Sequence, residues 1–78
     1  MENYNSMEEK ITAWIARDKS GILFMYTRKP VKGKSCNAWY LNAEELGGVG
    51  IEMDAKKFPQ VKWEDNEPTK VELTIRIV

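Results

Sequence analysis

The chain has 78 residues, of which 42% are hydrophobic and 31% are charged, with 12 basic and 12 acidic side chains and no histidine. This length and composition are typical of one small globular domain, and they exclude a disordered or fibrous protein. The absence of histidine removes the commonest general base near neutral pH, and the balanced charge provides no overall field to attract nucleic acid or anionic lipid.

Cysteine content and the amino-terminal sequence favour a cytoplasmic protein. The single cysteine, Cys36, cannot form an internal disulfide, and no basic region followed by an apolar stretch opens the chain. We therefore expect neither secretion nor a membrane span. The charges are unevenly distributed, because residues 1–40 carry seven Lys/Arg against four Asp/Glu and residues 41–78 carry five against eight, which gives net charges of +3 and −3.

The first third of the chain predicts a tail followed by a β-hairpin. Residues 1–9 are polar and aperiodic, which predicts a flexible N-terminal tail, and residues 10–78 are expected to form a single small β-rich domain. From Lys10 onward, apolar and β-branched residues alternate and predict a strand to Ala16. The segment from Asp18 to Gly21 predicts a turn, since glycine tolerates a positive φ, and residues 22–28 predict the second strand.

The remaining segments predict short strands separated by turns. Pro30 ends the second strand, residues 31–35 are expected to form a solvated turn, and residues 36–41 a third strand. Residues 42–47 and 54–59 each predict one short helical turn, and residues 49–53 a short strand. Val61 and Trp63 are expected on one face, and residues 71–77 form the clearest strand. The predicted fold class is mainly β, a small antiparallel sheet or partly open barrel of five to six short strands with one or two short helical turns.

One strand is apolar on both faces. Residues 22–26 read Ile-Leu-Phe-Met-Tyr, whereas a small antiparallel sheet normally has only one dry face. Either the short helical turns or a curled sheet cover the second face within the monomer, or a homodimer or another protein docks there.

The sequence predicts no catalytic residue, no metal site and no cofactor. Cys36 has no histidine to generate a thiolate, so an incidental or structural thiol is expected. Gly33-Lys34-Ser35 lacks the glycine that a phosphate-binding loop needs five positions earlier, where Arg28 stands. The acidic residues near the C-terminal end lack calcium-loop spacing and are expected to form solvated turns.

A basic run beside two aromatic residues supports an alternative function. Four cationic side chains lie close in sequence to Trp39 and Tyr40. Small β-barrels hold single-stranded nucleic acid with basic groups and aromatic platforms. The residues of this alternative are Arg28, Lys29, Lys32, Lys34 and Trp39. The competing interpretation is that the lysines keep a turn soluble while Trp39 belongs to the core.

Two blocks carry a resemblance to a known group of proteins. They are residues 14–30, with Trp14-Ile15-Ala16-Arg17-Asp18, and residues 58–73, with Phe58-Pro59-Gln60-Val61-Lys62-Trp63. In these blocks the chain resembles a family of short proteins of unknown function from gut Bacteroides-type bacteria and their phages. The resemblance implies a small accessory protein that acts by binding, on host or phage machinery.

The leading functional hypothesis is a non-enzymatic protein-interaction module. It rests on the two-sided apolar strand, the opposite charges of the two halves and the lack of catalytic residues. The expected contact residues are Phe24, Tyr26, Trp39 and Tyr40, since aromatic anchors dominate binding energy at interfaces. The expected partner is an unknown protein or a second copy of the chain, and Trp14, Trp63 and the final strand are assigned to folding.

Overall fold

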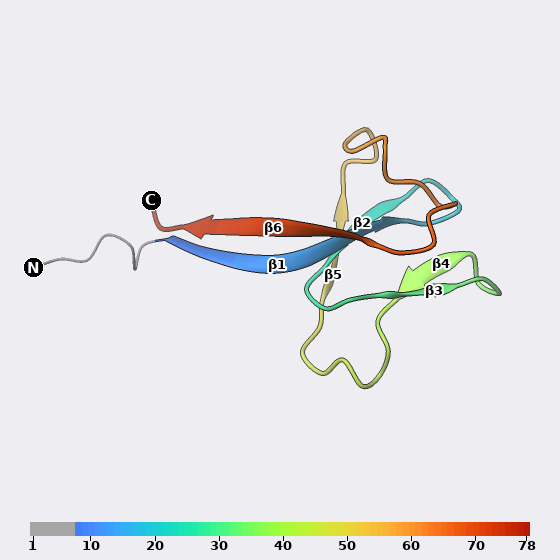
Figure 1. The fold of residues 1–78 in the computed structure, drawn as a ribbon, viewed down its shortest axis with the longest axis horizontal. Coiled ribbons are helices and arrows are strands. Elements are labelled where there is room, and N and C mark those ends of the chain that lie inside the picture. Colours follow the sequence, from blue (N-terminus) through green and yellow to red (C-terminus); the bar gives the residue numbers. More distant parts are fainter. Residues whose placement is uncertain (1–7) are drawn as a thin grey trace, which may run out of the picture.

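The computed structural model describes residues 8–78 and consists of β-strands joined by turns (Figure 1). The strands are β1 (Glu8–Arg17), β2 (Leu23–Tyr26), β3 (Val31–Gly33), β4 (Ala38–Tyr40), β5 (Gly50–Met53) and β6 (Thr69–Arg76). A four-stranded sheet has the order β5-β2-β1-β6, and β3 and β4 form a separate two-stranded sheet. All the pairs are antiparallel, so the predicted mainly β class is confirmed.

The predicted tail falls partly outside the described residues. Its first seven positions lie outside them, whereas Glu8 and Glu9 belong to β1, so the predicted start of the ordered chain at Lys10 was too late. Glu8 is aligned with Arg76 and Glu9 with Ile75 on β6. A polar sequence can thus be held in a strand when the facing strand supplies backbone partners and an opposite charge.

The helical turns predicted at residues 42–47 and 54–59 were wrong, because the described part of the chain contains no helix. Each segment instead forms isolated turns, in which the Glu45 N–H donates to the Asn42 carbonyl at 2.9 Å and the Lys57 N–H to the Asp54 carbonyl at 3.0 Å. Gly47 and Phe58 have φ angles of 78° and 50°, outside the right-handed helical region. A helix needs several consecutive bonds to offset the cost of its first turn, and these segments are too short. The described residues accordingly include no helix long and apolar enough to cross a membrane.

The predicted turn between the first two strands is confirmed. The Gly21 N–H donates to the Asp18 carbonyl at 2.9 Å, and the φ of 99° at Gly21 is the positive value that the turn requires. This turn sets the register of β1 and β2, in which Arg17 is aligned with Leu23 and Trp14 with Tyr26.

Both faces of β2 are buried within the chain itself. Leu23 packs with Ile15 of β1 and Val61 on one face of the sheet. On the other face, Tyr26 packs with Ala16 and Trp39. Val61 comes from the segment between β5 and β6, and Trp39 comes from β4. The second face of β2 is thus covered within the chain, as the first of the two explanations expected, but by β4 and by the segment before β6 rather than by helical turns.

Two further sequence expectations are corrected by this packing. Residues 31–33, expected in a solvated turn, form β3 and pair with β4. Val61 and Trp63 do not share a face, because Val61 packs with Leu23 while Trp63 packs with Tyr26 and Trp39. The segment crosses from one face of the sheet to the other and supplies one side chain to each side.

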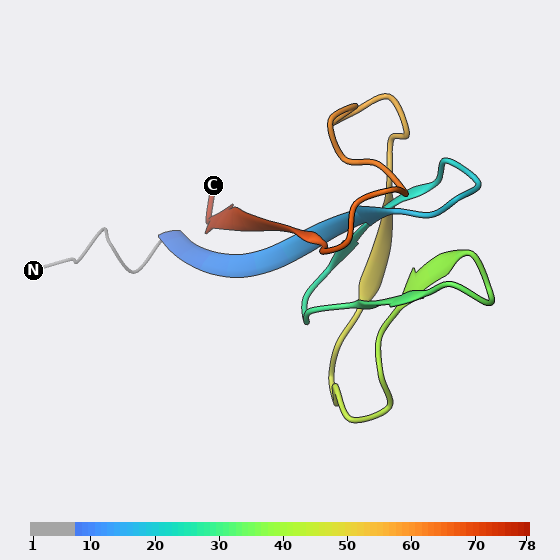
Figure 2. The ribbon, with the colours of Figure 1, turned by 45° about the vertical axis from the view of Figure 1, so that its right-hand side comes forward.

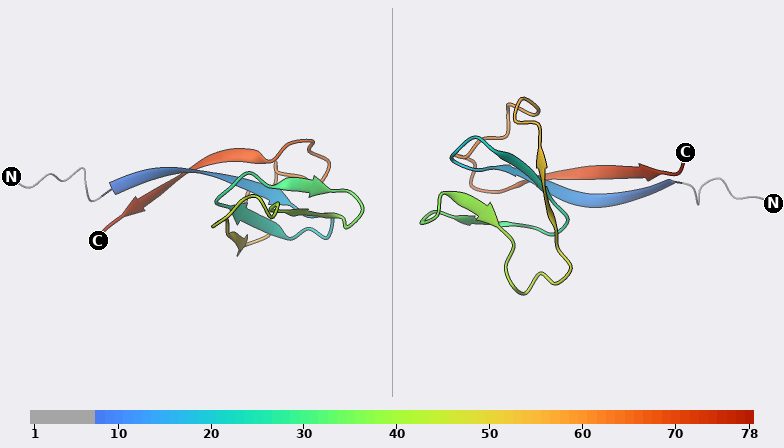
Figure 3. Two further views of the ribbon diagram at one scale, coloured as in Figure 1. Left: turned by 90° about the horizontal axis from the view of Figure 1, so that it is seen from below. Right: turned by 180° about the vertical axis from the view of Figure 1, so that it is seen from behind.

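The first half of β1 and the second half of β6 extend beyond the rest of the sheet. β1 pairs with β2 only from Trp14 to Arg17, but it pairs with β6 from Glu8 to Ile15. Figures 1 and 3 show that this two-stranded ribbon projects from the remaining strands and turns, and Figure 2 shows the turn segments at both ends of β5 on the other side of the molecule. We call residues 8–12 of β1 and 72–76 of β6 the arm.

Candidate functional site

Two of the four predicted contact residues lie in the core. The Trp39 indole N–H donates to the Arg17 carbonyl at 3.1 Å, and the Tyr26 hydroxyl donates to the Trp39 carbonyl at 3.2 Å. Burial, and secondarily the charge of Asp18, raises the pKa of Tyr26 to about 12. Phe24 is partly buried beside Tyr26, and only Tyr40, 47% exposed, has a largely accessible ring. The four residues thus do not form one exposed surface.

Two basic residues of the nucleic-acid alternative are bound to groups of the same chain. Lys32 Nζ lies 4.3 Å from the centre of the Trp63 ring and 5.8 Å from that of Trp39, and it donates to the carbonyls of Trp63 and Asp65. Lys29 pairs with Glu67 at 3.0 Å. Lys32 therefore acts as an internal clamp, because its ammonium group is bound by carbonyls and aromatic faces of the same chain.

The remaining members of that alternative are placed differently. Arg28 donates to the carbonyl of its neighbour Thr27 at 3.2 Å, and Lys34 lies exposed in the turn after β3. The Trp39 ring is buried, so it offers no open face on which a base could stack. The burial of Trp39 matches the expectation that this residue belongs to the core.

Arg17 organises the long segment between β5 and β6, a role that the sequence analysis did not identify. Its guanidinium group donates to five backbone carbonyls: those of Val61 at 2.7 Å, Gly21 at 2.8 Å, Ala55 at 3.0 Å, Lys57 at 3.0 Å and Phe58 at 3.2 Å. The only sequence signal was the inclusion of Arg17 in the Trp14–Asp18 block. A guanidinium group suits this position because its donors point in several fixed directions.

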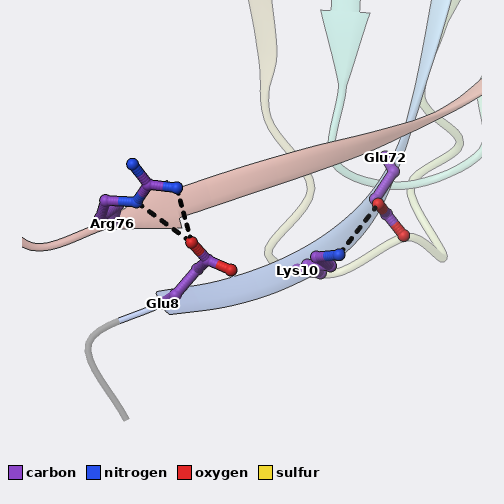
Figure 4. Close-up of polar contacts among 4 residues, drawn as sticks. All are labelled: Glu8, Lys10, Glu72 and Arg76. Atoms are coloured by element: carbon purple, nitrogen blue, oxygen red, sulfur yellow. Dashed lines mark hydrogen bonds and ion pairs between the residues drawn. The ribbon is translucent and has the colours of Figure 1, made fainter. Parts of the chain in front are cut away.

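The polar face of the arm carries two ion pairs between its strands. Arg76 donates to Glu8 Oε2 at 2.8 Å and 3.1 Å, and Lys10 Nζ lies 4.0 Å from Glu72 (Figure 4). All four side chains come from alternate positions and lie on the same side of the ribbon. At these exposures, each pair contributes at most about 1 kcal/mol to stability.

The opposite face of the arm is mainly apolar, with Glu9 as its one charged side chain. Ile11 is aligned with Leu73, and Ile75 with Glu9, while the next aligned pair toward the core is Ala13 with Val71. Ala13 is buried, but Ile11 is 36% exposed and Ile75 is 48% exposed. The apolar face of the core therefore continues along the arm and becomes open to solvent there. The sequence analysis assigned the final strand to folding alone and missed this exposure.

The arm also lies at an edge of the sheet. Among residues 8–78, β6 is the last strand in the order, so within this part of the chain no strand lies beside the outer backbone groups of its eight residues. The opposite edge, β5, is only four residues long. Long edge strands are the usual sites at which another chain adds to a sheet.

Neither a metal site nor a reactive centre stands out among the described residues. Within residues 8–78, no group of three or more Cys, Asp or Glu side chains is close enough to hold a metal ion. Cys36 is exposed, with its Sγ donating to the Gly33 carbonyl at 3.4 Å.

Comparison of the chain with protein-family models, with curated proteins and with solved structures found no match.

Proposed function

We propose that the chain is a non-enzymatic protein-interaction module that binds a protein through the arm. The single observation that carries this proposal is the two-sided construction of the arm, with ion pairs on one face and exposed isoleucines on the other. An apolar surface that projects away from its own core is costly in water, and such surfaces commonly mark sites of protein contact.

The contact that we propose lies on the arm rather than on the four aromatic residues. Tyr26 and Trp39 are needed to fill the core, and Tyr40 is a single exposed ring. The arm instead combines apolar side chains with an edge strand, so a partner can gain both apolar burial and backbone hydrogen bonds. The zero net charge and the internal binding of Lys32 favour this function over nucleic-acid binding.

The proposed setting is the cytoplasm of a Bacteroides-type bacterium, where the protein serves as an accessory factor of a phage or mobile element. The single exposed thiol of Cys36 suits a reducing compartment. The setting also follows the resemblance of the two sequence blocks to short proteins of such bacteria and phages.

Photo-crosslinking in such cells tests the proposal. A photoreactive amino acid replaces Ile75 on the arm or, as a matched control, Ile51 on β5, which is also 48% exposed. We expect protein adducts from position 75 that survive nuclease treatment and far fewer from position 51. Equal adduct yields at the two positions would contradict a role for the arm, and nuclease-sensitive adducts would favour nucleic-acid binding.

A further inference from the structure

The outer edge of β6 is unusually open to strand addition. Its eight residues keep an unbroken register with β1, and the strand contains neither proline nor glycine. Edges are normally protected by proline, by bulges or by charges that point into the apolar face. The charged side chains of β6 instead lie on the polar face, where Glu72 and Arg76 already pair with β1. The apolar face of β6 holds Val71, Leu73 and Ile75.

A two-stranded ribbon is also an incomplete unit of sheet structure. An isolated pair of strands is only marginally stable in water, whereas three or more strands with a common apolar face are stable. The arm is such a pair, because β2 and β5 do not reach it. Added strands at its edge would therefore stabilise it.

The sequence of β6 is complementary to itself in one antiparallel register. If two copies of β6 pair with Thr74 opposite Thr74, each Glu72 faces the Arg76 of the other copy, and each Leu73 faces the other Ile75. Charges then alternate in sign across the polar face, and apolar side chains meet on the other face. This register uses the projecting half of β6, which Figures 1 and 3 show clear of the turn segments.

The neighbouring registers are less favourable. Pairing centred on Leu73 sets Lys70 opposite Arg76, and pairing centred on Glu72 sets that carboxylate opposite itself, so both place like charges together. Pairing centred on Val71 joins Lys70 to Glu72, but it brings Pro68, which lacks an N–H donor, opposite Thr74. Only the register centred on Thr74 combines opposite charges with an uninterrupted strand.

We infer that the partner of the arm is a second copy of this chain, joined through antiparallel β6–β6 pairing centred on Thr74, which deepens the proposed function and rests on it. The two four-stranded sheets become one continuous sheet, with the two arms forming four adjacent strands at its centre. Ile75, 48% exposed in the single chain, gains Leu73 of the second copy as a cross-strand neighbour.

Two charge-reversed variants test the register. E72R alone places arginine opposite arginine, and R76E alone places glutamate opposite glutamate, so each is expected to self-associate about tenfold more weakly or worse than the parent. In an equimolar mixture the two chains are complementary again, and a heterodimer is expected with near-parental affinity. Sedimentation equilibrium measures the association, and circular dichroism confirms that each variant is folded.

The mixture separates pairing from any effect within one chain. E72R loses the ion pair with Lys10, and R76E loses the ion pair with Glu8, whether each variant is alone or in the mixture. A general weakening of the arm therefore cannot be rescued by mixing. Three results would each overturn the inference. The parent could stay monomeric even at 100-fold the concentration used for thermal melting of the protein. Alternatively, the folded single variants could dimerise like the parent, or the mixture could form no heterodimer.

Disulfide trapping locates the contact. In a C36S background, which removes the exposed thiol, T74C should form a covalent dimer on mild oxidation because the two cysteines face each other. T12C is the matched control, since Thr12 lies on the same face but on β1, one strand away from the edge. Equal trapping at positions 12 and 74 would overturn the β6–β6 arrangement.

The results distinguish the two levels of the proposal. A monomeric purified protein whose position 75 still crosslinks to a different protein in cells would refute the second copy as partner and leave the interaction function intact. A protein that neither dimerises nor crosslinks through the arm would refute both.

Discussion

At the scale of single residues, two polar groups in the interior determine how the turns are held. Arg17 binds five carbonyls, four of them in residues 55–61, and Tyr26 bonds to Trp39. Buried or half-buried polar groups contribute to stability when they are fully paired, and removing one partner leaves the others unsatisfied. Substitutions of these two residues are therefore expected to destabilise the fold through lost hydrogen bonds as well as lost packing.

Arg17→Lys should lower the free energy of unfolding by about 1.5–3 kcal/mol. An ammonium group cannot reach five carbonyls in the directions that the guanidinium group serves, so several of them lose their donor. Urea denaturation measures the change. Arg28→Lys is the control, because Arg28 donates only to the Thr27 carbonyl, and it should change stability by no more than about 0.5 kcal/mol. Equal effects of the two substitutions would contradict the role of Arg17.

Tyr26 should make the protein sensitive to alkaline pH. Its pKa is raised from 10.0 in the unfolded chain to about 12 in the folded protein, mainly by burial. Above pH 10 the unfolded chain releases this proton while the folded protein retains it, so stability is complete below pH 10 and falls as pH rises toward 12. Thermal melts between pH 9 and 11.5 should show a steeper decline for the parent than for Tyr26→Phe. Parallel declines would exclude Tyr26 as the cause.

At the scale of elements, β6 has two halves with different functions. Its first half packs against the core through Val71, and its second half forms the arm. β3 pairs with β4, and its Lys32 binds carbonyls of the segment that precedes β6. The contribution of a residue to stability therefore depends on which part of its strand it occupies.

Two leucines of different burial test the division of the sheet. Replacing Leu23, which is fully buried in β2, with alanine should lower the free energy of unfolding by about 2–5 kcal/mol, which is enough to unfold so small a domain. Replacing Leu73, which is half-buried in the arm, with alanine should lower the free energy of unfolding of the monomer by only about 1 kcal/mol. Chemical denaturation at low protein concentration compares them, and a larger loss for Leu73→Ala would show that the arm is part of the core.

Charge reversal at two lysines of the same hairpin tests the clamp. Lys32→Glu should destabilise the fold by about 1–3 kcal/mol, since a carboxylate would face two carbonyls and two aromatic rings. Lys34→Glu should leave stability within about 0.5 kcal/mol of the parent, because Lys34 is exposed. Thermal melts followed by tryptophan fluorescence report on both. Equal loss of oligonucleotide binding by two equally stable variants would instead support the basic run as a phosphate site.

At the scale of the whole molecule, an open apolar face and an open edge occur together at one end. Elsewhere among the described residues, Leu46 and Phe58 are also exposed, but they lie on turns rather than on a long edge strand. The arm combines an exposed apolar face with an edge strand of eight residues, which suits the proposed association.

The association should appear as a melting temperature that depends on concentration. If the native form is a dimer, a 100-fold increase in protein concentration favours it by about 2.7 kcal/mol through mass action, so the melting temperature should rise by several degrees. R76E, which breaks the complementary register, should melt at nearly the same temperature at both concentrations. A parent with a concentration-independent melting temperature would contradict a dimer.

Local patterns in the sequence determined the two longest strands, whereas β3 was expected to be a turn. The alternation in residues 10–16 and 71–77 and the Asp18–Gly21 turn predicted β1, β6 and the first hairpin, because side-chain period and glycine conformation are properties of neighbouring residues. The predicted helical turns failed, since short capped segments cannot offset the cost of helix nucleation without packing. The roles of Arg17 and Lys32 could not be predicted, because all their carbonyl partners except Gly21 lie 31 to 44 positions away.

Only the tertiary structure decided which apolar residues remain exposed. The sequence of β2 is apolar on both faces and that of β6 on one face, but neither pattern says how far a strand extends. β2 lies between two packed faces, and the second half of β6 extends past them. Burial depends on how far each strand reaches beyond its neighbours, and this follows from the register of all the strands together. The alternating pattern established that residues 71–77 have an apolar face, and the sheet order left that face, and the edge beside it, open for another chain.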